Sequence, residues 1–337
     1  MKALICTEPG RFDYINVPEP KHLPGQTLLS IKRVGICGTD IHAFDGTQPF
    51  FQYPRILGHE LAATIITTDN PDFVSGETVT VLPYFNCGNC VACNNGKPNC
   101  CVQIKVCGVH IDGGMQEILS VPSNSLIKSE GLSLDALALV EPLSIGEHAV
   151  KRAAIKEGEN VLIIGAGPIG LGLMDMARLS GANVIAMDVN ESRLEVGKNK
   201  FQIDHLINPK KEAAFEKLAD ITNGAMPTVI IDATGSLGAI NNALQYLAHG
   251  GRYVLVGLQK EAFSFSHPEF HKRETSLLSS RNASKANFEQ VIHYLKKGQV
   301  NPENYISHRF DFETIAANFA GLTKPENATI KAMINMP

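Results

Sequence analysis

The stretch Asn160–Gly170 reads NVLIIGAGPIG, and it decides the fold of the middle of the chain. Asn160–Ile164 is a short apolar run followed by glycines, which is typical of a buried strand. Gly165, Gly167 and Gly170 then follow with G-x-G-x-x-G spacing at the start of a helix-like run. In such a unit the first glycine allows a tight turn, the second lets the backbone approach a pyrophosphate, and the third lets helix and strand pack closely. The stretch therefore predicts a dinucleotide-binding site.

An acidic residue at the end of the next strand indicates which dinucleotide is bound. Pro168 and Ile169 open the helix, whose N-terminus would face the anionic diphosphate. The next apolar strand, Asn183–Met187, ends in Asp188, which should accept from both ribose hydroxyls of the adenosine and repel a 2′-phosphate. NAD is therefore expected over NADP, with Arg193 as the one nearby residue that could hold a 2′-phosphate instead.

Further strands and helices alternate after this unit. The apolar runs Thr228–Ile231 and Tyr253–Val256 are separated by the helix-like run Gly238–Leu247. Such alternation predicts a doubly wound parallel sheet of the Rossmann type. Turns at the carboxyl ends of its strands would line the cofactor site, and two of them contain small residues: Thr234-Gly235-Ser236 and Val256-Gly257-Leu258.

Length and charge exclude several other classes of protein. The 337 residues suffice for two domains and a sizeable core. The net charge is −4 and no block of Lys or Arg is present, so nucleic acid is not expected as a partner. The longest uncharged apolar stretch, Val161–Met174, is too short to span a membrane. The start MKALICTEPGR lacks a secretory apolar region, so a cytoplasmic setting is expected, where cysteines stay reduced.

Five of the eight cysteines lie in one glycine-containing segment, CGNCVACNNGKPNCC. Cys87, Cys90, Cys93 and Cys101 have the spacing C-x2-C-x2-C-x7-C, and four thiolates close in sequence can enclose one zinc ion with no open position. This pattern predicts a structural zinc site. Cys100 could replace Cys101 as the fourth ligand, and a reactive or disulfide-forming cluster is the alternative interpretation.

A second set of metal-ligand types is dispersed along the first part of the chain. Cys37 lies in GICGTDIH, His59 and Glu60 lie in LGHE, and Glu141 lies in VEPL. Ligands from distant segments favour a site that keeps one position open for water or substrate. Each of these residues, taken alone, is more often an ordinary core or surface residue. The first 145 residues are rich in Val, Ile, Thr, Gly and Pro, which indicates short strands and turns.

These motifs together resemble the zinc-dependent medium-chain dehydrogenases over essentially the whole chain. The matching segments are GICGTDIH, LGHE, the cysteine segment, DGGMQE, VEPLSIGEHA, GAGPIGLG and DATGS. The resemblance implies an α/β plus mostly β architecture, in which residues 1–145 and 284–337 form a GroES-like catalytic domain and residues 146–283 form an inserted Rossmann domain. It also implies homodimers or homotetramers. Within the family, the Glu-Pro pair at Glu141 resembles the polyol and sugar-acid branch, which includes sorbitol, L-idonate, L-galactonate and threonine dehydrogenase-like enzymes.

The resemblance also implies roles for individual residues. Cys37, His59 and Glu60 would ligate a catalytic zinc, and Glu141 would orient the water on that zinc or exchange into the ligand set. Adjacent residues seldom face one metal from a regular strand, so His59 and Glu60 are expected on a bend or at the start of a helix, and which of Glu60 and Glu141 ligates zinc stays open. Two zinc ions per chain are expected.

Further roles concern the proton and the substrate. Thr39 and His42 would form a hydroxyl–imidazole relay for the released proton. In SSRNAS, Arg281 would grip a carboxylate near the nicotinamide, with Asn282 beside it. Phe44, Phe50 and Phe51 could wall the substrate pocket or belong to the core.

The expected reaction is hydride transfer from a secondary alcohol of a sugar acid or polyol to NAD. A threonine or polyol-phosphate dehydrogenase is the alternative within the family. A non-catalytic NAD- and zinc-binding protein on the same fold is the alternative from another class.

Overall fold

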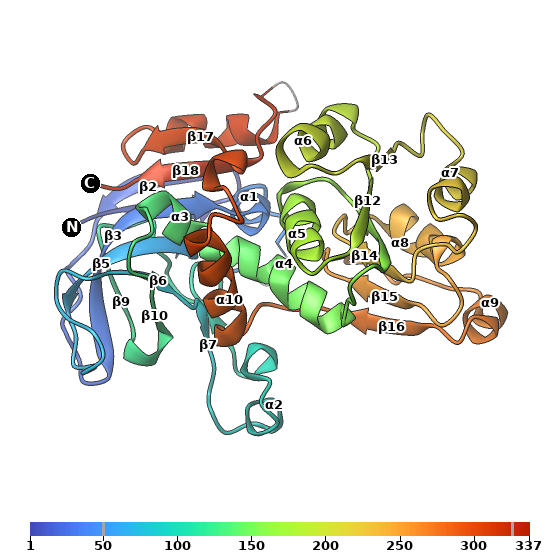
Figure 1. Ribbon diagram of the computed structural model, residues 1–337. Coiled ribbons are helices and arrows are strands. Elements are labelled where there is room, and N and C mark those ends of the chain that lie inside the picture. The colour runs from blue at the N-terminus through green and yellow to red at the C-terminus, as the bar shows by residue number, and fades with distance from the viewer. Residues whose placement is uncertain (49–50, 325–326) are drawn as a thin grey trace. The chain divides into compact units, whose positions relative to one another are not determined.

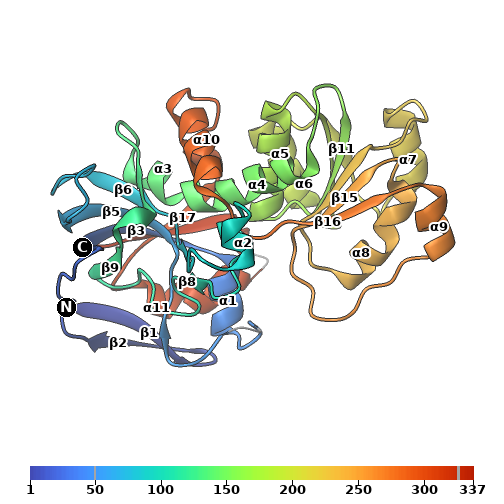
Figure 2. The same ribbon diagram turned by 90° about the horizontal axis from the view of Figure 1, so that it is seen from below.

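The computed structural model describes residues 1–48, 51–324 and 327–337, and the chain divides into two compact units (Figure 1). Residues 1–142 and 283–337 form the first unit, and residues 143–282 form the second. The divisions expected from the family resemblance are 145/146 and 283/284. The first unit is discontinuous because both ends of the chain build it, and Figure 2 shows both termini there.

Antiparallel strands dominate the first unit. Its largest sheet has the order β10-β6-β5-β3-β18-β17, and β9 also pairs with β3. The C-terminal strand β18 lies inside this sheet, antiparallel to β3 and parallel to β17. A smaller sheet has the order β2-β1-β4, and β7 pairs with β8. The strands are β1 (Lys2–Glu8), β2 (Arg11–Asn16), β3 (Gln26–Ile36), β4 (Arg55–Ile56), β5 (Glu60–Thr67), β6 (Thr78–Val81), β7 (Tyr84–Phe85), β8 (Lys105–Val106), β9 (Ile118–Pro122), β10 (Leu126–Lys128), β17 (Ile306–Asp311) and β18 (Lys331–Asn335).

The first unit has a hydrophobic core to which both its strands and its C-terminal segment contribute. Strand β3 contributes Leu29, Ile31 and Val34, which are fully buried because their side chains pack into the hydrophobic core of the unit. Phe312 and Phe319 from the C-terminal segment pack in the same cluster. Both ends of the chain thus share one core, whose burial provides most of the favourable free energy of folding.

Short helices connect the strands of the first unit. Helix α1 (Gly38–Phe44) starts directly after β3, and its capping residue is Cys37. The Asp40 side chain accepts from the Cys37 backbone N–H at 2.9 Å, which completes a capping box and fixes where the helix starts. The other helices are α2 (Val91–Asn94), α3 (Leu134–Ala138), α10 (Lys285–Lys296) and α11 (Ile315–Asn318), with 3-10 turns at Pro98–Cys100, Ser123–Ser125, Pro302–Asn304 and Phe319–Thr323.

The second unit is a six-stranded parallel sheet with the order β13-β12-β11-β14-β15-β16. The doubly wound parallel sheet predicted from the alternating pattern is confirmed. The strands are β11 (Asn160–Ile164), β12 (Asn183–Met187), β13 (His205–Ile207), β14 (Val229–Asp232), β15 (Arg252–Leu255) and β16 (Ser276–Ser279). The helices are α4 (Val140–Ala153), which begins in the first unit, α5 (Pro168–Leu179), α6 (Glu191–Phe201), α7 (Ala214–Ile221), α8 (Leu237–Ala243), which continues as a 3-10 turn (Leu244–Tyr246), and α9 (His267–Lys272).

Central strands of this sheet are buried on both faces. Leu162 and Ile163 are adjacent in β11, point to opposite faces, and are both fully buried. Their burial accounts for the continuous apolar run that replaces alternation in the sequence.

Within the described residues, no helix has both the length and the apolar character needed to cross a membrane.

Candidate functional site

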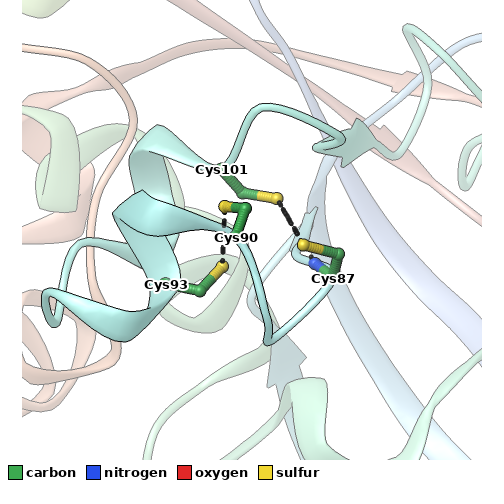
Figure 3. A group of neighbouring side chains, drawn as sticks. All are labelled: Cys87, Cys90, Cys93 and Cys101. Atoms are coloured by element: carbon green, nitrogen blue, oxygen red, sulfur yellow. Dashed lines mark hydrogen bonds between the residues drawn. The ribbon is translucent and has the colours of Figure 1, made fainter.

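The four predicted zinc-binding cysteines converge in the loop between β7 and β8 (Figure 3). The sulfur atoms of Cys87, Cys90, Cys93 and Cys101 all lie within 4.8 Å of one another. The Sγ atoms are 3.5 Å apart in both the Cys90–Cys93 and the Cys87–Cys101 pair. Zinc–sulfur bonds of about 2.3 Å in a tetrahedron place sulfur atoms roughly 3.8 Å apart, and the separations in this cluster are close enough to that value for the four sulfur atoms to hold a zinc ion.

The loop backbone favours thiolates at this cluster. The N–H groups of Cys87 and Gln103 each donate to Cys101 Sγ at 3.3 Å. Hydrogen bonds from the backbone of Cys93 and Val102 lower the pKa of Cys90 to about 6. The exposed Cys100 does not belong to the cluster, so the geometry favours Cys101 over Cys100 as the fourth ligand.

A second cluster joins residues from two strand ends. Cys37 Sγ, a ring nitrogen of His59 and a carboxylate oxygen of Glu60 lie within 4.8 Å of one another. Cys37 follows β3, while His59 precedes β5 and Glu60 begins it. Gly58, with φ of +95°, makes the bend that lets the adjacent His59 and Glu60 face one point. His59 and Glu60 are buried. A thiolate, an imidazole and a carboxylate form a donor set that suits zinc and leaves one tetrahedral position open.

Asp40 supports this second cluster from behind. Its Oδ1 lies 3.7 Å from His59 Nδ1 and accepts from the Gly58 N–H at 3.3 Å. Burial opposes a charged imidazole, but Asp40, Cys37 and Glu141 outweigh it and hold the pKa of His59 well above its usual range. Burial also raises the pKa of Asp40 itself. A carboxylate beside a metal-binding histidine commonly orients the ring.

Glu60 has a second partner, Lys331 from the C-terminal strand β18. Lys331 Nζ lies 2.6 Å from Glu60 Oε1 and 2.7 Å from Oε2, and it donates to the Ile36 carbonyl at 3.1 Å. Both side chains are almost fully buried. Gly35 makes room for the carboxylate, because a Cβ there would lie 2.1 Å from Glu60 Oε2. Burial disfavours the Lys331 cation, yet the Glu60 charge raises the pKa of the lysine above its ordinary value.

Glu141 lies near this cluster but is not one of its three members. The Tyr84 hydroxyl donates to Glu141 Oε1, and both side chains are buried. Burial raises the pKa of Glu141 to about 7; the Glu60 charge also raises it, whereas His59 and the Tyr84 hydrogen bond lower it. Burial and the Glu141 carboxylate raise the pKa of Tyr84 well above its usual range.

Sequence reasoning missed Asp40, Tyr84 and Lys331. A signal existed only for Asp40, which stands three residues after Cys37 at the position of a capping box. Lys331 is 271 residues away from Glu60 along the chain, and nothing in the local sequence pairs them.

The predicted relay residues both lie on α1. His42 is exposed, and its Nδ1 is 2.9 Å from the Thr47 hydroxyl. Thr39 is half-buried near the start of the helix. Phe44 and Phe51 pack against the core of the first unit. Phe50 lies outside the described residues.

The glycine turn of the second unit has the geometry that its spacing predicted. Gly165 has φ of +101°, and a Cβ on Gly170 would lie 1.7 Å from the Gly165 carbonyl oxygen, so neither accepts a side chain. Gly167 caps α5, which begins with Pro168 and Ile169. The helix N-terminus is therefore open to an anion.

The acidic residue after β12 contacts this turn. Asp188 Oδ2 accepts from the Ala166 N–H at 2.6 Å, and Oδ1 accepts from the Asn190 N–H at 2.8 Å. Arg193 is exposed in the first turn of α6, and its Nη1 lies 4.0 Å from the position of a Cβ on Gly167. The carboxylate and the guanidinium that would distinguish a ribose hydroxyl from a 2′-phosphate thus lie at the same turn.

Two further turns meet at the carboxyl ends of β14 and β15. A Cβ on Gly257 would lie 2.2 Å from the Gly235 nitrogen, and one on Gly235 would lie 2.5 Å from the Leu258 carbonyl oxygen. Asp232 Oδ1 holds the first turn by accepting from the Thr234 N–H and hydroxyl, each at 2.8 Å. Val256 N–H bonds back to the Asp232 carbonyl at 2.9 Å.

The predicted substrate residues lie beyond β16, at the end of the second unit. Arg281 is exposed, and Asn282 is half-buried with φ of +54°.

Comparison with known proteins shows the family of the chain. Two family profiles match the chain: the alcohol dehydrogenase GroES-like domain over residues 23–131, and the zinc-binding dehydrogenase domain over residues 168–297. L-galactonate-5-dehydrogenase of Escherichia coli (strain K12) is 42% identical over 321 residues, which cover 95% of this chain and 94% of the relative. The chain belongs to the zinc-dependent medium-chain dehydrogenases. This confirms the resemblance and the fold class inferred from the motifs.

Other members of the family are similar over most of their length. The 2-dehydro-3-deoxy-L-galactonate 5-dehydrogenase of Pseudoalteromonas atlantica is 32% identical and covers 88% of both chains. The crystal structure of the alcohol dehydrogenase RspB of E. coli CFT073, in complex with NADH, has a TM-score of 0.93 at 32% identity and covers 99% of both chains. As a member of this family, the protein is a zinc-dependent oxidoreductase that uses a nicotinamide cofactor.

Proposed function

We propose that this zinc-dependent dehydrogenase oxidises a secondary alcohol of a sugar acid to a ketone, with NAD as the hydride acceptor. The observation that carries the proposal is the buried cluster of Cys37, His59 and Glu60, a three-donor set with one open tetrahedral position. Names of relatives that act on L-galactonate and on 2-dehydro-3-deoxy-L-galactonate support a sugar acid as the substrate.

The proposed ligands of the catalytic zinc are Cys37, His59 and Glu60, with Glu141 beside them. When bound there, zinc would polarise a hydroxyl group and lower its pKa towards the neutral range. The Asp40 carboxylate lies 3.7 Å from His59 Nδ1 and would favour that ring orientation by its charge, and Lys331 offsets the charge of Glu60.

The proposed proton path uses groups of α1 and Glu141. The buried carboxylate of Glu141, close to the proposed zinc ligands, can accept a hydroxyl proton from the substrate. We further propose that the Thr39 hydroxyl and the exposed imidazole of His42 carry the released proton to water.

The proposed cofactor residues lie at the carboxyl edge of the parallel sheet. The helix start at Gly165, Gly167, Pro168, Ile169 and Gly170 would hold the diphosphate. Asp188 would accept from the adenosine ribose hydroxyls, which favours NAD, and Arg193 would flank the adenine.

The paired turns of the sheet supply the remaining cofactor contacts in this proposal. Their residues are Thr234, Gly235, Val256, Gly257 and Leu258.

Arg281 is the proposed carboxylate-binding residue, with Asn282 beside it. A guanidinium can hold a carboxylate with two parallel hydrogen bonds, which an uncharged polyol cannot provide. A threonine dehydrogenase would also present a carboxylate, and a polyol-phosphate dehydrogenase would present a phosphate. These are the alternative substrates within the family.

The assembly and location are also proposals. We propose a homodimer or homotetramer that works in the cytoplasm, and light scattering after gel filtration measures the number of subunits.

The experiment that tests the substrate is NADH production by the zinc-loaded protein. Matched sets of hexonates, hexitols, hexitol phosphates and L-threonine are compared, with NADP in parallel wells. We expect turnover of a hexonate with NAD, and a loss in kcat/KM of about tenfold or more in Arg281→Ala, from the loss of a charged hydrogen bond. Arg11→Ala is the matched control, because Arg11 is exposed on β2.

Other outcomes would change the proposal. Turnover of hexitols alone would remove Arg281 from its role, and turnover of threonine or a phosphate would replace the sugar acid. NADH binding without turnover of any alcohol would favour a non-catalytic protein.

A further inference from the structure

Glu141 is hydrogen-bonded to Tyr84, which is not one of the proposed zinc ligands. The Tyr84 hydroxyl donates to Glu141 Oε1, and both side chains are buried in the first unit. Glu141 interacts electrostatically with His59 and Glu60, so it lies close to the proposed zinc ligands. Nevertheless, among the residues that the structure describes, the metal-binding group with Cys37 and His59 contains the carboxylate of Glu60 and not that of Glu141. The carboxylate held by Tyr84 is the one outside the cluster.

The fold fixes the position of the Tyr84 hydroxyl. Tyr84 is the first residue of β7 and pairs with Val106 of β8. The chain between these two strands is the loop that carries the four cysteines (Figure 3). The Tyr84 ring also packs edge-to-face on Phe288, with ring centres 6.5 Å apart. A zinc ion bound by the four cysteines would therefore restrain the loop that joins β7 to β8, and with it the strand that carries the Tyr84 hydroxyl.

The hydrogen bond matters because of the coordination that catalysis needs. A zinc ion with four protein ligands is closed to substrate, whereas three protein ligands leave a position for it. Cys37, His59 and Glu60 already provide three donors. Glu141 would be a fourth if its carboxylate turned towards the metal, and a nearby dication would attract it.

We propose that Tyr84 is a positioning residue that holds Glu141 away from the metal at Cys37, His59 and Glu60 and so keeps one coordination position open for the alcohol. The inference rests on the proposed function for the identity of those three ligands. It also gives the four-cysteine loop a role in the reaction, because that loop supports the strand that presents Tyr84.

The test uses Tyr84→Phe, which keeps the ring and its packing on Phe288 but removes the hydroxyl. The probe is Co²⁺ added to the metal-depleted protein, because its visible absorption reports the number and type of ligands. We expect the substrate-free spectrum of Tyr84→Phe to change to that of a site with an additional carboxylate. We also expect Co²⁺ to bind about tenfold more tightly, at the lower end of the effect that residues behind metal ligands usually have.

Two controls separate a positioning role from general damage. Tyr14→Phe also removes one tyrosine hydroxyl bond, to the Phe312 carbonyl, and should leave the spectrum unchanged. In an Glu141→Gln background, Tyr84→Phe should have no further effect on the spectrum or the affinity, because the carboxylate it releases is gone. The same melting temperature for Tyr84→Phe and Tyr14→Phe would show that both fold.

The outcomes distinguish this inference from the proposed function. Cys37→Ser supplies the spectrum of Co²⁺ in the four-cysteine loop alone. If the parent protein gives only that spectrum, the proposed catalytic ligand set fails. If the parent shows the second site and Tyr84→Phe has the same spectrum and affinity, the role of Tyr84 is wrong. Weaker Co²⁺ binding in Tyr84→Phe would also overturn it, because Tyr84 would then present Glu141 to the metal.

Discussion

The four-cysteine loop and the Cys37–His59–Glu60 cluster differ in how the chain assembles them. The loop takes all its ligands from residues 87–101, and its sulfur atoms contact mainly one another and their own backbone. The second cluster takes its three candidate donors from two strand ends, and two of them, His59 and Glu60, lie beside the charged side chains of Asp40 and Lys331. The donor atoms of the loop are therefore brought together by a short segment of sequence. The second cluster forms only once β3 has paired with β5, and Glu60 gains its lysine only once β18 has paired with β3.

This difference has a chemical counterpart. The cysteine ligands are four of one kind and leave no position open, as a structural site requires. The second cluster combines three kinds of donor with a buried lysine, a buried aspartate and a tyrosine-bound glutamate. A site that must exchange a ligand in each turnover needs such restraints on the groups around it.

The largest effect is expected from His59→Ala, which should abolish the function of one site and spare the other. Because a zinc ligand is lost, we expect turnover to fall by more than about a thousandfold, beyond the 10–100-fold typical of residues behind the ligands. Zinc analysis should show the loss of one of the two ions. The melting temperature of the zinc-loaded variant should change little, because the four-cysteine loop keeps its ion. Full zinc content together with full turnover would remove His59 from the site.

Cys93→Ser should remove the zinc ion of the four-cysteine loop and leave the other ion in place. A metal-binding loop without its ion loses binding free energy that is on the order of 10 kcal/mol in isolated zinc peptides, so we expect the variant to melt well below the parent. The matched control is Cys100→Ser, because Cys100 is exposed and outside the cluster. Thermal unfolding and zinc content measure both. Equal loss in the two variants would mean that Cys100 also ligates zinc.

Lys331→Met should separate the metal-free from the metal-bound protein. Without the lysine, Glu60 is a buried and unpaired carboxylate, and breaking such a pair costs about 3–5 kcal/mol. Zinc at the same carboxylate would replace part of the missing charge, so the variant should gain more stability from zinc than the parent does. Melting curves with and without zinc measure this difference. An equal gain in both proteins would show that Glu60 does not reach the metal.

The smallest expected effect is a difference in the pH at which the two metals leave. A ligand with a lowered pKa stays deprotonated at lower pH, and in the loop the pKa of Cys90 is lowered to about 6 and that of Cys87 is also lowered. A backbone hydrogen bond from Cys87 lowers the pKa of Cys101, but burial and the neighbouring thiols raise it overall, so two of the four thiols favour zinc retention on acidification. A ligand with a raised pKa loses metal to protons earlier, and the pKa of His59 is raised by Asp40, Cys37 and Glu141 despite its burial. As the pH falls, the second cluster should therefore release zinc first. Zinc release measured against pH in Cys37→Ser, which keeps the loop, and in the parent tests this order.

The sequence was most informative where structure is local. Strands Asn160–Ile164 and Asn183–Met187 have the predicted bounds, because apolar runs end at glycine or aspartate. The predicted strand Thr228–Ile231 is observed one residue later, as Val229–Asp232, because strand pairing and not composition sets its ends. Helix α10 begins at Lys285, directly after its capping residue Ser284, which is also a local signal.

The partners of the ligands could not be predicted in the same way. Nothing in the local sequence distinguishes Tyr84, because its hydroxyl reaches Glu141 only through the tertiary fold. Lys331 stands in a strand whose alternation gives no reason for a buried cation. A buried charge is specified by a partner that pairing of distant strands provides, and a single sequence does not record that pairing.

The place of β18 inside its sheet bears on the order in which the protein is made. A ribosome releases residues 143–282 before the last strand exists, so the parallel-sheet unit can fold during synthesis. The antiparallel unit must wait, because β3 and β17 both need β18 between them. Until residue 331 emerges, the carboxylate of Glu60 has no lysine, and β3 has an unpaired edge. A premature stop at or just before codon 331 would thus leave a chain in which part of β3 lacks its neighbour and Glu60 lacks its lysine, and such an unpaired strand edge favours aggregation and recognition by proteases and chaperones.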